Sequence, residues 1–269
     1  MNTKPNALSL GRITITFAAT ESQPRSLEAI TRLAARYSSE VSGVFIEDSD
    51  MLRAIRLPFA LEVCRATNRV KPADLIEIER SLKQRAVSAR QLITDTAEQS
   101  GIKWNFKVIR QRTASAVLEL AQGSDVIVFS SATSNQHRQR VTKEEVSRSP
   151  HHPLNGDSIV VLLDDSVAGA KAAEFAHKFA ELRQILLSAV VIDTQQEGLD
   201  KRVHRLLQES RYRVAHIQAL CNPGFSEVVT TASALHPVAL VLPATLIDGS
   251  SERIREFEEQ IDCPILIVN

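Results

Sequence analysis

Features that mark several specialised classes of protein are scarce in this sequence. Its three cysteines, Cys64, Cys221 and Cys263, lie far apart with no CxxC spacing, so neither a disulfide framework nor a zinc cluster is expected. The longest uncharged apolar runs reach only strand length, whereas a membrane helix needs about 20 residues. Residues 1–9 contain one lysine and no apolar stretch of the kind found in signal peptides. We therefore expect a cytoplasmic protein without a membrane partner.

A surplus of charge of one sign is also lacking. Lys and Arg together number 32, as do Asp and Glu, which argues against a nucleic-acid partner held by bulk positive charge. Residues 1–150 nevertheless hold 22 basic and 16 acidic side chains, a net +6, and the remainder hold 10 and 16, a net −6. Either the two halves simply have solvated surfaces of different charge, or they dock on one another through surfaces of opposite charge. We favour the first interpretation, because surface charge adds little stability.

The sequence lacks the motifs of several common enzyme classes. It contains no G-x-S-x-G, no G-x-G-x-x-G and no Walker loop, and its seven histidines show no HxH or HxxxH spacing. Hydrolase, dehydrogenase and P-loop functions therefore lose their usual support, and no metal site is expected. We predict a protein that is not an enzyme.

What the sequence does contain is an alternation of strands and helices. With 269 residues, 43% hydrophobic and 24% charged, the chain is globular and long enough for about two domains. Periodicity predicts strands at 12–18, 41–46, 104–108, 125–129, 159–163, 185–192, 212–220, 238–242 and 264–268, with helices at 27–37, 74–99, 113–121, 168–182, 199–208, 226–235 and 252–261. This order favours parallel strands joined by right-handed crossovers.

The two halves of the chain open in the same way. Residues 15–22 read ITFAATES and residues 159–166 read IVVLLDDS, and a polar stretch at 130–157 separates the halves. A duplicated unit explains this economically. We predict an α/β protein of two tandem doubly wound parallel-sheet domains, 1–153 and 154–269.

Short strings in the second half resemble the universal stress protein family. They are Asp164-Asp165-Ser166 before an alanine-rich helix, the penultimate strand at 238–242, and the closing Cys263-Pro264-Ile265-Leu266-Ile267-Val268. The resemblance implies two Rossmann-like copies in tandem. No comparable closing strand follows Val146 in the first half, so that copy is expected to be degenerate and to lack its last strand.

Family members that bind ATP use an acidic residue after the first strand, an apolar residue on the second, and a G-x-x-G-x9-G-[S/T] loop after the fourth. The glycines let the backbone approach the phosphates. In the first half, Thr20 takes the acidic position and no glycine occurs between Gly123 and Gly156. Arg138 and Arg140 in that stretch are interpreted as solvated linker residues. We expect no ATP binding of the family type there.

The second half keeps part of this apparatus. The resemblance marks Asp164, Val190, Gly249 and Ser250 as a candidate nucleotide site, although residues 243–248 lack the first two glycines of the loop. The alternative for Asp164 and for Gly249-Ser250 is a helix cap and a turn. No cofactor is expected, and ATP in the second half remains the alternative.

We therefore predict a non-catalytic, stress-associated regulatory or binding protein. The alternative is an ATP-binding protein that uses the second domain only, with slow hydrolysis. A third hypothesis, an enzyme related to adenine-nucleotide α-hydrolases, is weaker because it rests on fold analogy alone.

An apolar segment, Met51 to Val63, is too large to be left exposed on a monomer and is expected to be covered. Our first hypothesis is that the other half of the chain covers this segment. The second is that the segment forms a helical lid over its own domain, and the third is that it forms a homodimer contact.

Overall fold

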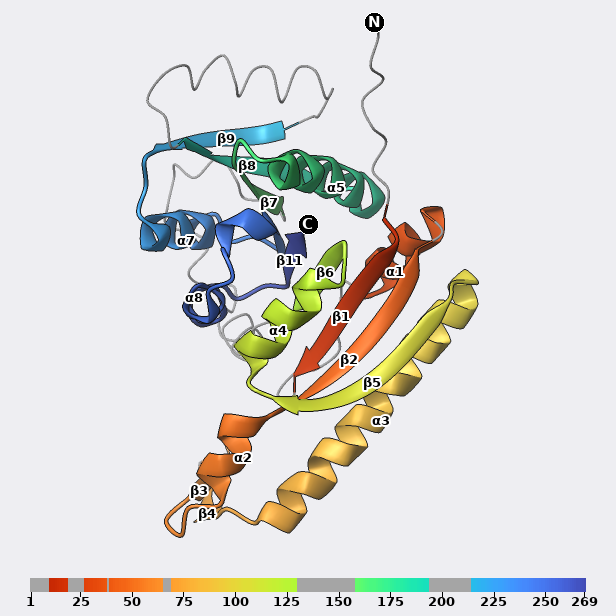
Figure 1. The fold of residues 1–269 in the computed structure, drawn as a ribbon, viewed down its shortest axis with the longest axis vertical. Helices are drawn as coiled ribbons and strands as arrows, with labels where there is room; N and C mark the ends of the chain where they lie inside the picture. Colours follow the sequence, from red (N-terminus) through yellow and green to blue (C-terminus); the bar gives the residue numbers. More distant parts are fainter. Residues whose placement is uncertain (1–9, 19–26, 38, 65–68, 130–157, 194–213) are drawn as a thin grey trace, which may run out of the picture.

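The computed structural model describes residues 10–18, 27–37, 39–64, 69–129, 158–193 and 214–269. A sheet of nine strands forms its centre, in the order β5-β2-β1-β6-β11-β10-β7-β8-β9, and a separate pair, β3-β4, forms a hairpin (Figure 1). The strands of the large sheet are β1 (Arg12–Ala18), β2 (Glu40–Asp48), β5 (Trp104–Gln111), β6 (Val126–Phe129), β7 (Ser158–Leu163), β8 (Leu186–Asp193), β9 (Val214–Cys221), β10 (Ala239–Pro243) and β11 (Ile265–Val268). The hairpin strands are β3 (Leu61–Cys64) and β4 (Arg69–Pro72). The helices are α1 (Leu27–Arg36), α2 (Ser49–Ile55), α3 (Leu75–Ser100), α4 (Thr113–Gln122), α5 (Val167–Arg183), α7 (Phe225–Ala234), η1 (Ala244–Leu246) and α8 (Ser251–Gln260).

The large sheet consists of two parallel strand groups joined by one antiparallel pair. The first group, β5-β2-β1-β6, is parallel throughout. The second group, β11-β10-β7-β8-β9, is also parallel. Between them β6 pairs with β11 in antiparallel orientation, from Phe129 opposite Ile265 to Val126 opposite Val268. The structure is thus mixed α/β with one large, mostly parallel sheet, and its division into two tandem domains stays a prediction.

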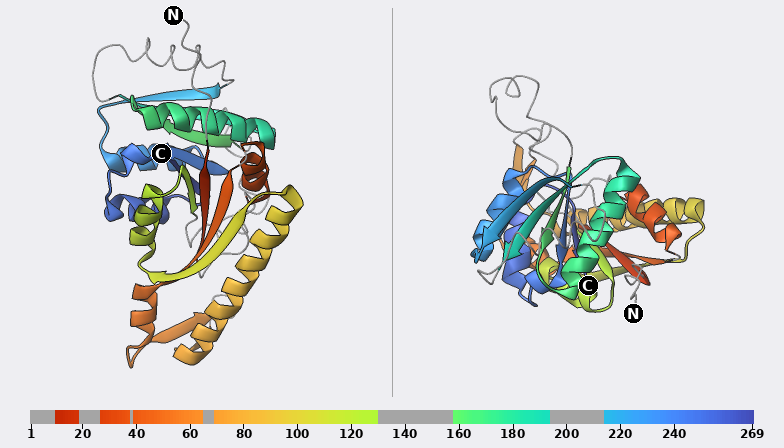
Figure 2. Two further views of the ribbon diagram at one scale, coloured as in Figure 1. Left: turned by 45° about the vertical axis from the view of Figure 1, so that its right-hand side comes forward. Right: turned by 90° about the horizontal axis from the view of Figure 1, so that it is seen from above.

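Helices cover both faces of the sheet, and each cover includes helices from both halves of the chain. On one face α1, α3 and α5 enclose a core that includes Ile30, Ile93 and Phe175. On the other face α4, α7 and α8 enclose a second core, with Val117 and Ile254 among its members. The further views show the same three-layer arrangement (Figure 2). Each core is continuous across the junction between the strand groups.

The longest helix shows how local sequence sets its boundaries. Asp74 caps the start of α3 by accepting hydrogen bonds from the amides of Ile76 and Glu77, and Gly101 ends it in the left-handed conformation with φ 63°. Both ends were predicted from the sequence and are confirmed. Where α3 crosses β2, a side chain on Gly43 would overlap Ile93, so this glycine allows the helix to approach the strand closely.

Most of the predicted elements are confirmed, with ends shifted by one to three residues. The predicted helix at 199–208 and the join at 130–157 lie outside the described residues, and the boundary between the two predicted domains is therefore still a prediction. Elements that the sequence analysis did not predict are α2, the β3-β4 hairpin and the short helix η1. In the described part of the chain, no helix has both the length and the apolar character that a membrane crossing requires.

The structure covers only the first part of the apolar segment 51–63. Leu52 is buried and Met51 and Ile55 pack against the core, but Phe59 is 74% exposed and Leu61 62% exposed. The end of this segment is therefore exposed among the described residues. Its last residues enter the hairpin, which lies at the far end of the molecule from the second strand group (Figure 1).

The last residue of the sequence fastens the second strand group to the first. The amide of Asn269 donates to the carbonyl of Asp125 at 2.9 Å, and its side-chain Nδ2 donates to the carbonyls of Ala121 and Ser124, each at 2.5 Å. These carbonyls belong to the end of α4 and the turn after it, where a helix leaves acceptors without intrahelical partners. Asn269 therefore supplies a cap across the junction.

We predict that Asn269→Ala lowers the free energy of unfolding by about 1–2 kcal/mol, because two carbonyls lose a partly buried donor. Urea denaturation of the full chain measures this change. Gln260→Ala, which removes an exposed amide with a single contact of 3.5 Å to Glu256, is the control and should change stability by less than about 0.5 kcal/mol. Equal stability of the two variants would contradict the assigned role of Asn269.

Candidate functional site

Asp164 lies at the carboxyl end of β7, where β7 neighbours β10. Its Oδ1 accepts hydrogen bonds from the amide of Ser166 at 3.1 Å and from the hydroxyl of Ser166 at 2.5 Å. Its Oδ2 accepts from the hydroxyl of Thr245 at 2.5 Å. Thr245 belongs to η1, directly after β10. The carboxylate thus ties together the ends of two adjacent strands at the position where open α/β sheets bind ligands.

The helix that follows Asp164 is capped by a different residue. Ser166 is the N-cap of α5, and its hydroxyl accepts from the amide of Gly169 at 2.9 Å. A side chain on Gly169 would overlap both the carboxylate and the backbone carbonyl of Asp164. The first turn of α5 therefore lies directly against Asp164 and covers one side of it.

Val190 lies inside the core. It exposes none of its surface and packs in the cluster that also contains Val160 on β7 and Leu240 on β10. A ligand could contact this side chain only if core residues moved. The structure therefore does not bring Val190 to the surface beside Asp164.

Gly249 and Ser250 form the turn that starts α8. Asp248 and Gly249 both have positive φ, 50° and 67°, and a side chain on Gly249 would meet no atom within 4 Å. The Ser250 hydroxyl caps α8 by accepting from the amide of Arg253 at 3.4 Å. These contacts correspond to the turn and cap that the sequence analysis gave as the alternative for this pair.

The four candidate residues are thus only partly brought together. Asp164 is linked to the loop that contains Gly249 through Thr245, four residues earlier in that loop. Val190 lies apart from them in the core. Thr20, Arg138 and Arg140, which the sequence analysis considered in the first half, lie outside the described residues.

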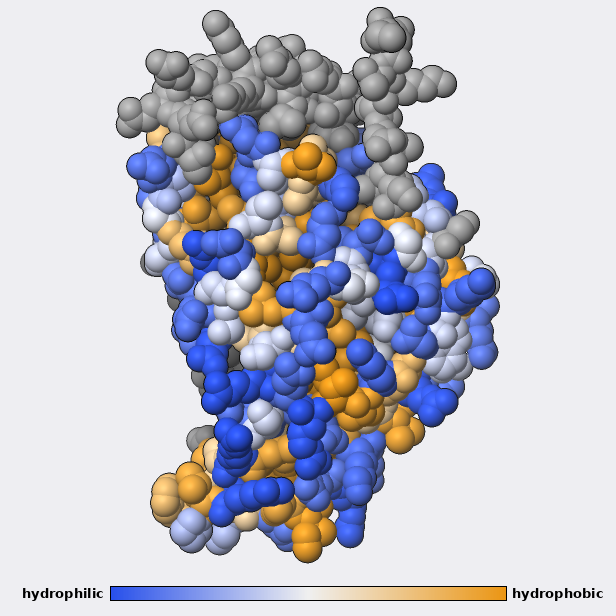
Figure 3. Space-filling model, in the orientation of Figure 1, coloured by the Kyte–Doolittle hydropathy of each residue, from blue (hydrophilic) through white to orange (hydrophobic). Residues whose placement is uncertain are grey.

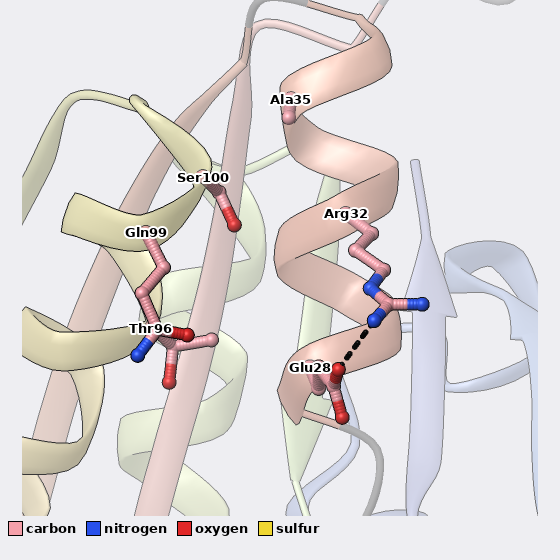
Figure 4. A pocket seen from close by; sticks show the side chains of 6 residues that line it. All are labelled: Glu28, Arg32, Ala35, Thr96, Gln99 and Ser100. Atoms are coloured by element: carbon pink, nitrogen blue, oxygen red, sulfur yellow. Dashed lines mark hydrogen bonds and ion pairs between the residues drawn. The ribbon is translucent and has the colours of Figure 1, made fainter.

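A hollow elsewhere in the molecule offers little chemistry. It has a volume of about 340 Å³, lies between α1 and α3 (Figure 4), and is lined by Glu28, Arg32, Ala35, Thr96, Gln99 and Ser100. Its one guanidinium, that of Arg32, is paired with Glu28 at 2.6 Å. Within the described ranges no three His, Cys, Asp or Glu side chains are arranged to hold a metal ion.

A second engaged carboxylate, that of Asp48, lies at the carboxyl end of β2 in the first strand group. Its Oδ1 accepts from the amides of Asp50 and Met51, at 2.8 and 2.9 Å, and caps α2. Its Oδ2 accepts from the amide and hydroxyl of Thr113, at 3.2 and 2.8 Å. Partial burial alone would raise the pKa of Asp48, but the hydrogen bonds from Met51, Thr113 and Asp50 outweigh it and hold the pKa below the ordinary 3.8.

Glu258 on α8 faces this carboxylate from the other half of the chain. Burial, followed by the negative charge of Asp48, raises the pKa of Glu258 from 4.5 to about 7, against the opposing charge of Arg255. The sequence analysis missed both acidic residues. An Asp before a short helix is a capping signal that could have indicated Asp48, whereas no local pattern places Glu258 beside a residue 210 positions earlier.

The shift at Glu258 predicts a particular dependence of stability on pH. Between pH 4.5 and about 7 the folded chain holds a proton that the unfolded chain has released, so the free energy of unfolding falls as pH rises through this window. Glu258→Gln cannot ionise and should not show this fall in the free energy of unfolding. We expect the variant to be more stable than the parent by on the order of 2 kcal/mol at about pH 8 and to differ little from it near the ordinary pKa of Glu. Urea unfolding across the pH range tests this. Glu227→Gln makes the same charge change at an exposed residue of α7 that is not among the charges acting on Glu258, and identical profiles for the two variants would refute the assignment.

The contact between Asp164 and Thr245 gives a second prediction. Thr245→Val keeps the shape of the side chain but removes the donor to Oδ2, so we expect a loss of about 1–3 kcal/mol in the free energy of unfolding. Thermal and urea unfolding measure it. Thr94→Val on the exposed side of α3, where the hydroxyl only donates to the carbonyl of Arg90, is the matched control. A loss no larger than that of the control would show that the contact does not hold the strand ends together.

Comparison with known proteins identifies similar structures but no related sequence. No family model matches the chain, and no curated protein sequence matches it. A universal stress protein from Archaeoglobus fulgidus DSM 4304 is similar over 95% of this chain and 96% of its own, with 10% identity and a TM-score of 0.48. A universal stress protein assigned in Pseudomonas aeruginosa UCBPP-PA14 is similar over 98% and 95%, with 12% identity and a TM-score of 0.49. The assignment of the site residues therefore rests on the contacts described above.

Proposed function

We propose that this chain is a stress-associated regulatory or binding protein of the universal stress type, without catalytic activity, and that its ATP apparatus is degenerate in both halves. The short strings around Asp164 and in the closing strand support the type. The hydrogen bonds that Asp164 accepts from Ser166 and Thr245 support the lack of nucleotide binding.

The proposal includes an internal duplication, which the strand order supports. Counted along the chain within each group, β5-β2-β1-β6 and β9-β8-β7-β10 both follow the order third, second, first, fourth. The similar strings at 15–22 and 159–166 fall at β1 and β7, which occupy the same place in this order. Strand β11 is the fifth of the second group, and among the described strands it has no counterpart in the first.

The observation that carries the proposal is the occupation of the Asp164 carboxylate. Oδ1 of Asp164 accepts two hydrogen bonds from Ser166 and Oδ2 accepts one from Thr245, which leaves about one of the four acceptor positions of a carboxylate for a ligand. A nucleotide that needed more than this position would displace one of these hydrogen bonds, and it could reach the buried Val190 only if core residues moved. The free energy of such binding would be reduced by the cost of both rearrangements.

One observation favours the alternative, an ATP-binding second half. Gly249 adopts the left-handed conformation in open space directly before the start of α8, and glycine before a helix N-terminus is a common phosphate-binding arrangement. The same geometry is explained by the turn alone, since Ser250 caps the helix and donates its amide to the carbonyl of Ile247 at 2.9 Å. We therefore keep ATP binding, with or without slow hydrolysis, as the second candidate.

Calorimetric titration of the full chain with ATP, ADP and AMP tests the proposal. We expect no saturable heat up to a concentration of about 1 mM, and native mass spectrometry of freshly purified protein should show no bound nucleotide. A measurable affinity that disappears in Gly249→Glu, while Val87→Glu on α3 retains it, would overturn the proposal and establish the alternative. Hydrolysis of ATP above the level of an Asp164→Ala variant would show an enzyme.

A further inference from the structure

The β3-β4 hairpin has one apolar and one charged face. Leu61 pairs with Pro72 and Val63 pairs with Val70 across the antiparallel strands, and directly opposite residues point to the same side. Leu61, Val63 and Val70 are 62%, 55% and 57% exposed, and Pro72 is also exposed. These four residues, termed here the apolar hairpin face, therefore lie open to solvent.

The opposite face of the hairpin is charged. Glu62 pairs with Lys71 across the strands, and their side chains form an ion pair at 3.3 Å. Lys71 also contacts Glu77 at the start of α3, at 2.7 Å. Arg69, which pairs with Cys64, lies on the same face and is exposed. This face therefore combines the bridged Glu62 and Lys71 with one further guanidinium.

The hairpin is held firmly at the end of the molecule. It follows α2, whose start is capped by Asp48 and whose Asp50 pairs with Arg112 at 3.1 Å. It precedes α3, and the amide of Ala73 donates to the carbonyl of Ala60 at 2.9 Å to close its base. Figures 1 and 2 show this arm extending away from the large sheet. A partner can therefore approach it without colliding with the second strand group.

Other apolar side chains enlarge the exposed area at this end. Leu57 and Phe59 in the turn before β3 are 48% and 74% exposed, and Ile76 in the first turn of α3 is 71% exposed. Figure 3 shows hydrophobic residues gathered at this lower end of the molecule. At roughly 100 Å² for each of the six large side chains, the exposed apolar area is on the order of 600 Å². That is at the upper limit for a monomer and close to the ~800 Å² that each partner contributes to a standard interface.

We propose that two copies of this chain associate through the apolar hairpin face. Two flat two-stranded sheets can pack face to face, and a two-fold axis between them makes the same four residues serve both sides. A two-stranded hairpin is marginally stable by itself, so covering its apolar face also stabilises the arm. Self-association accounts for the size of the exposed apolar area at this end of the molecule.

The oligomeric state of the full chain tests this proposal. Sedimentation velocity between about 1 and 200 µM should show a monomer–dimer equilibrium with a Kd in the micromolar range. Val63→Glu places like charges on both sides of the interface and should weaken association at least about tenfold. Val87→Glu makes the same change at a valine that is 69% exposed on α3, about 18 Å along the helix from its start, and should leave the equilibrium unchanged.

A second measurement uses the unaltered protein and does not depend on the folding of a variant. Hydrogen exchange of residues 57–63 and 69–72 should slow as the concentration rises, while the edge strands β5 and β9 of the large sheet keep their rates. A monomer throughout the range, a dimer that Val63→Glu leaves intact, or protection confined to β5 or β9 would overturn the proposal. Binding of a monomer to vesicles of phosphatidylcholine and phosphatidylglycerol, lost in Val63→Glu, would assign the face to a membrane instead and would equally refute it.

Discussion

The antiparallel pairing of β6 with β11 is the constraint on which the rest of the architecture depends. Each strand group is parallel, so reversing direction once, between these two strands, reverses the whole second group relative to the first. Both edges of β6 are paired, with β1 on one side and β11 on the other. A single sheet with shared cores on both faces follows from this one contact.

The reversal also decides where the polar ends of the strands lie. The carboxyl ends of the first group, with Asp48, lie at the edge of the sheet where β11 begins, and the end of α8 brings Glu258 there. The carboxyl ends of the second group, with Asp164, lie at the opposite edge, where Asn269 reaches the start of the first group. The two edges differ in character. Asp164 is satisfied by hydroxyl groups, whereas Asp48 shares its surroundings with a second carboxyl group.

Local signals predicted the elements well and the contacts between distant elements poorly. Asp74 and Gly101 marked the ends of α3 because caps depend on neighbouring backbone, and the alternation from Trp104 to Val108 marked β5. The junction could not be predicted, because the hydrophobic pattern of a strand such as β11 is the same whether its neighbour is parallel or antiparallel. Whether Asp164 and Ser250 belong to a ligand site stays a prediction. Ser250 lies in the turn and helix cap given as its alternative, whereas Ser166 and not Asp164 caps α5. The partner Thr245 and the neighbour Glu258 could not be predicted, because their contacts depend on tertiary packing.

The junction has a further consequence for the way the chain reaches this structure. Phe129 and Ile265 are 136 positions apart in the sequence, so the outer edge of β6 can pair with β11 only after these 136 further residues have been synthesised. At a synthesis rate of about 5–20 residues per second, an unprotected hydrophobic strand edge persists for roughly 7–30 s on the ribosome. Such an edge can template wrong pairing with other nascent chains. The long-range closure also raises the contact order, which slows the final folding step.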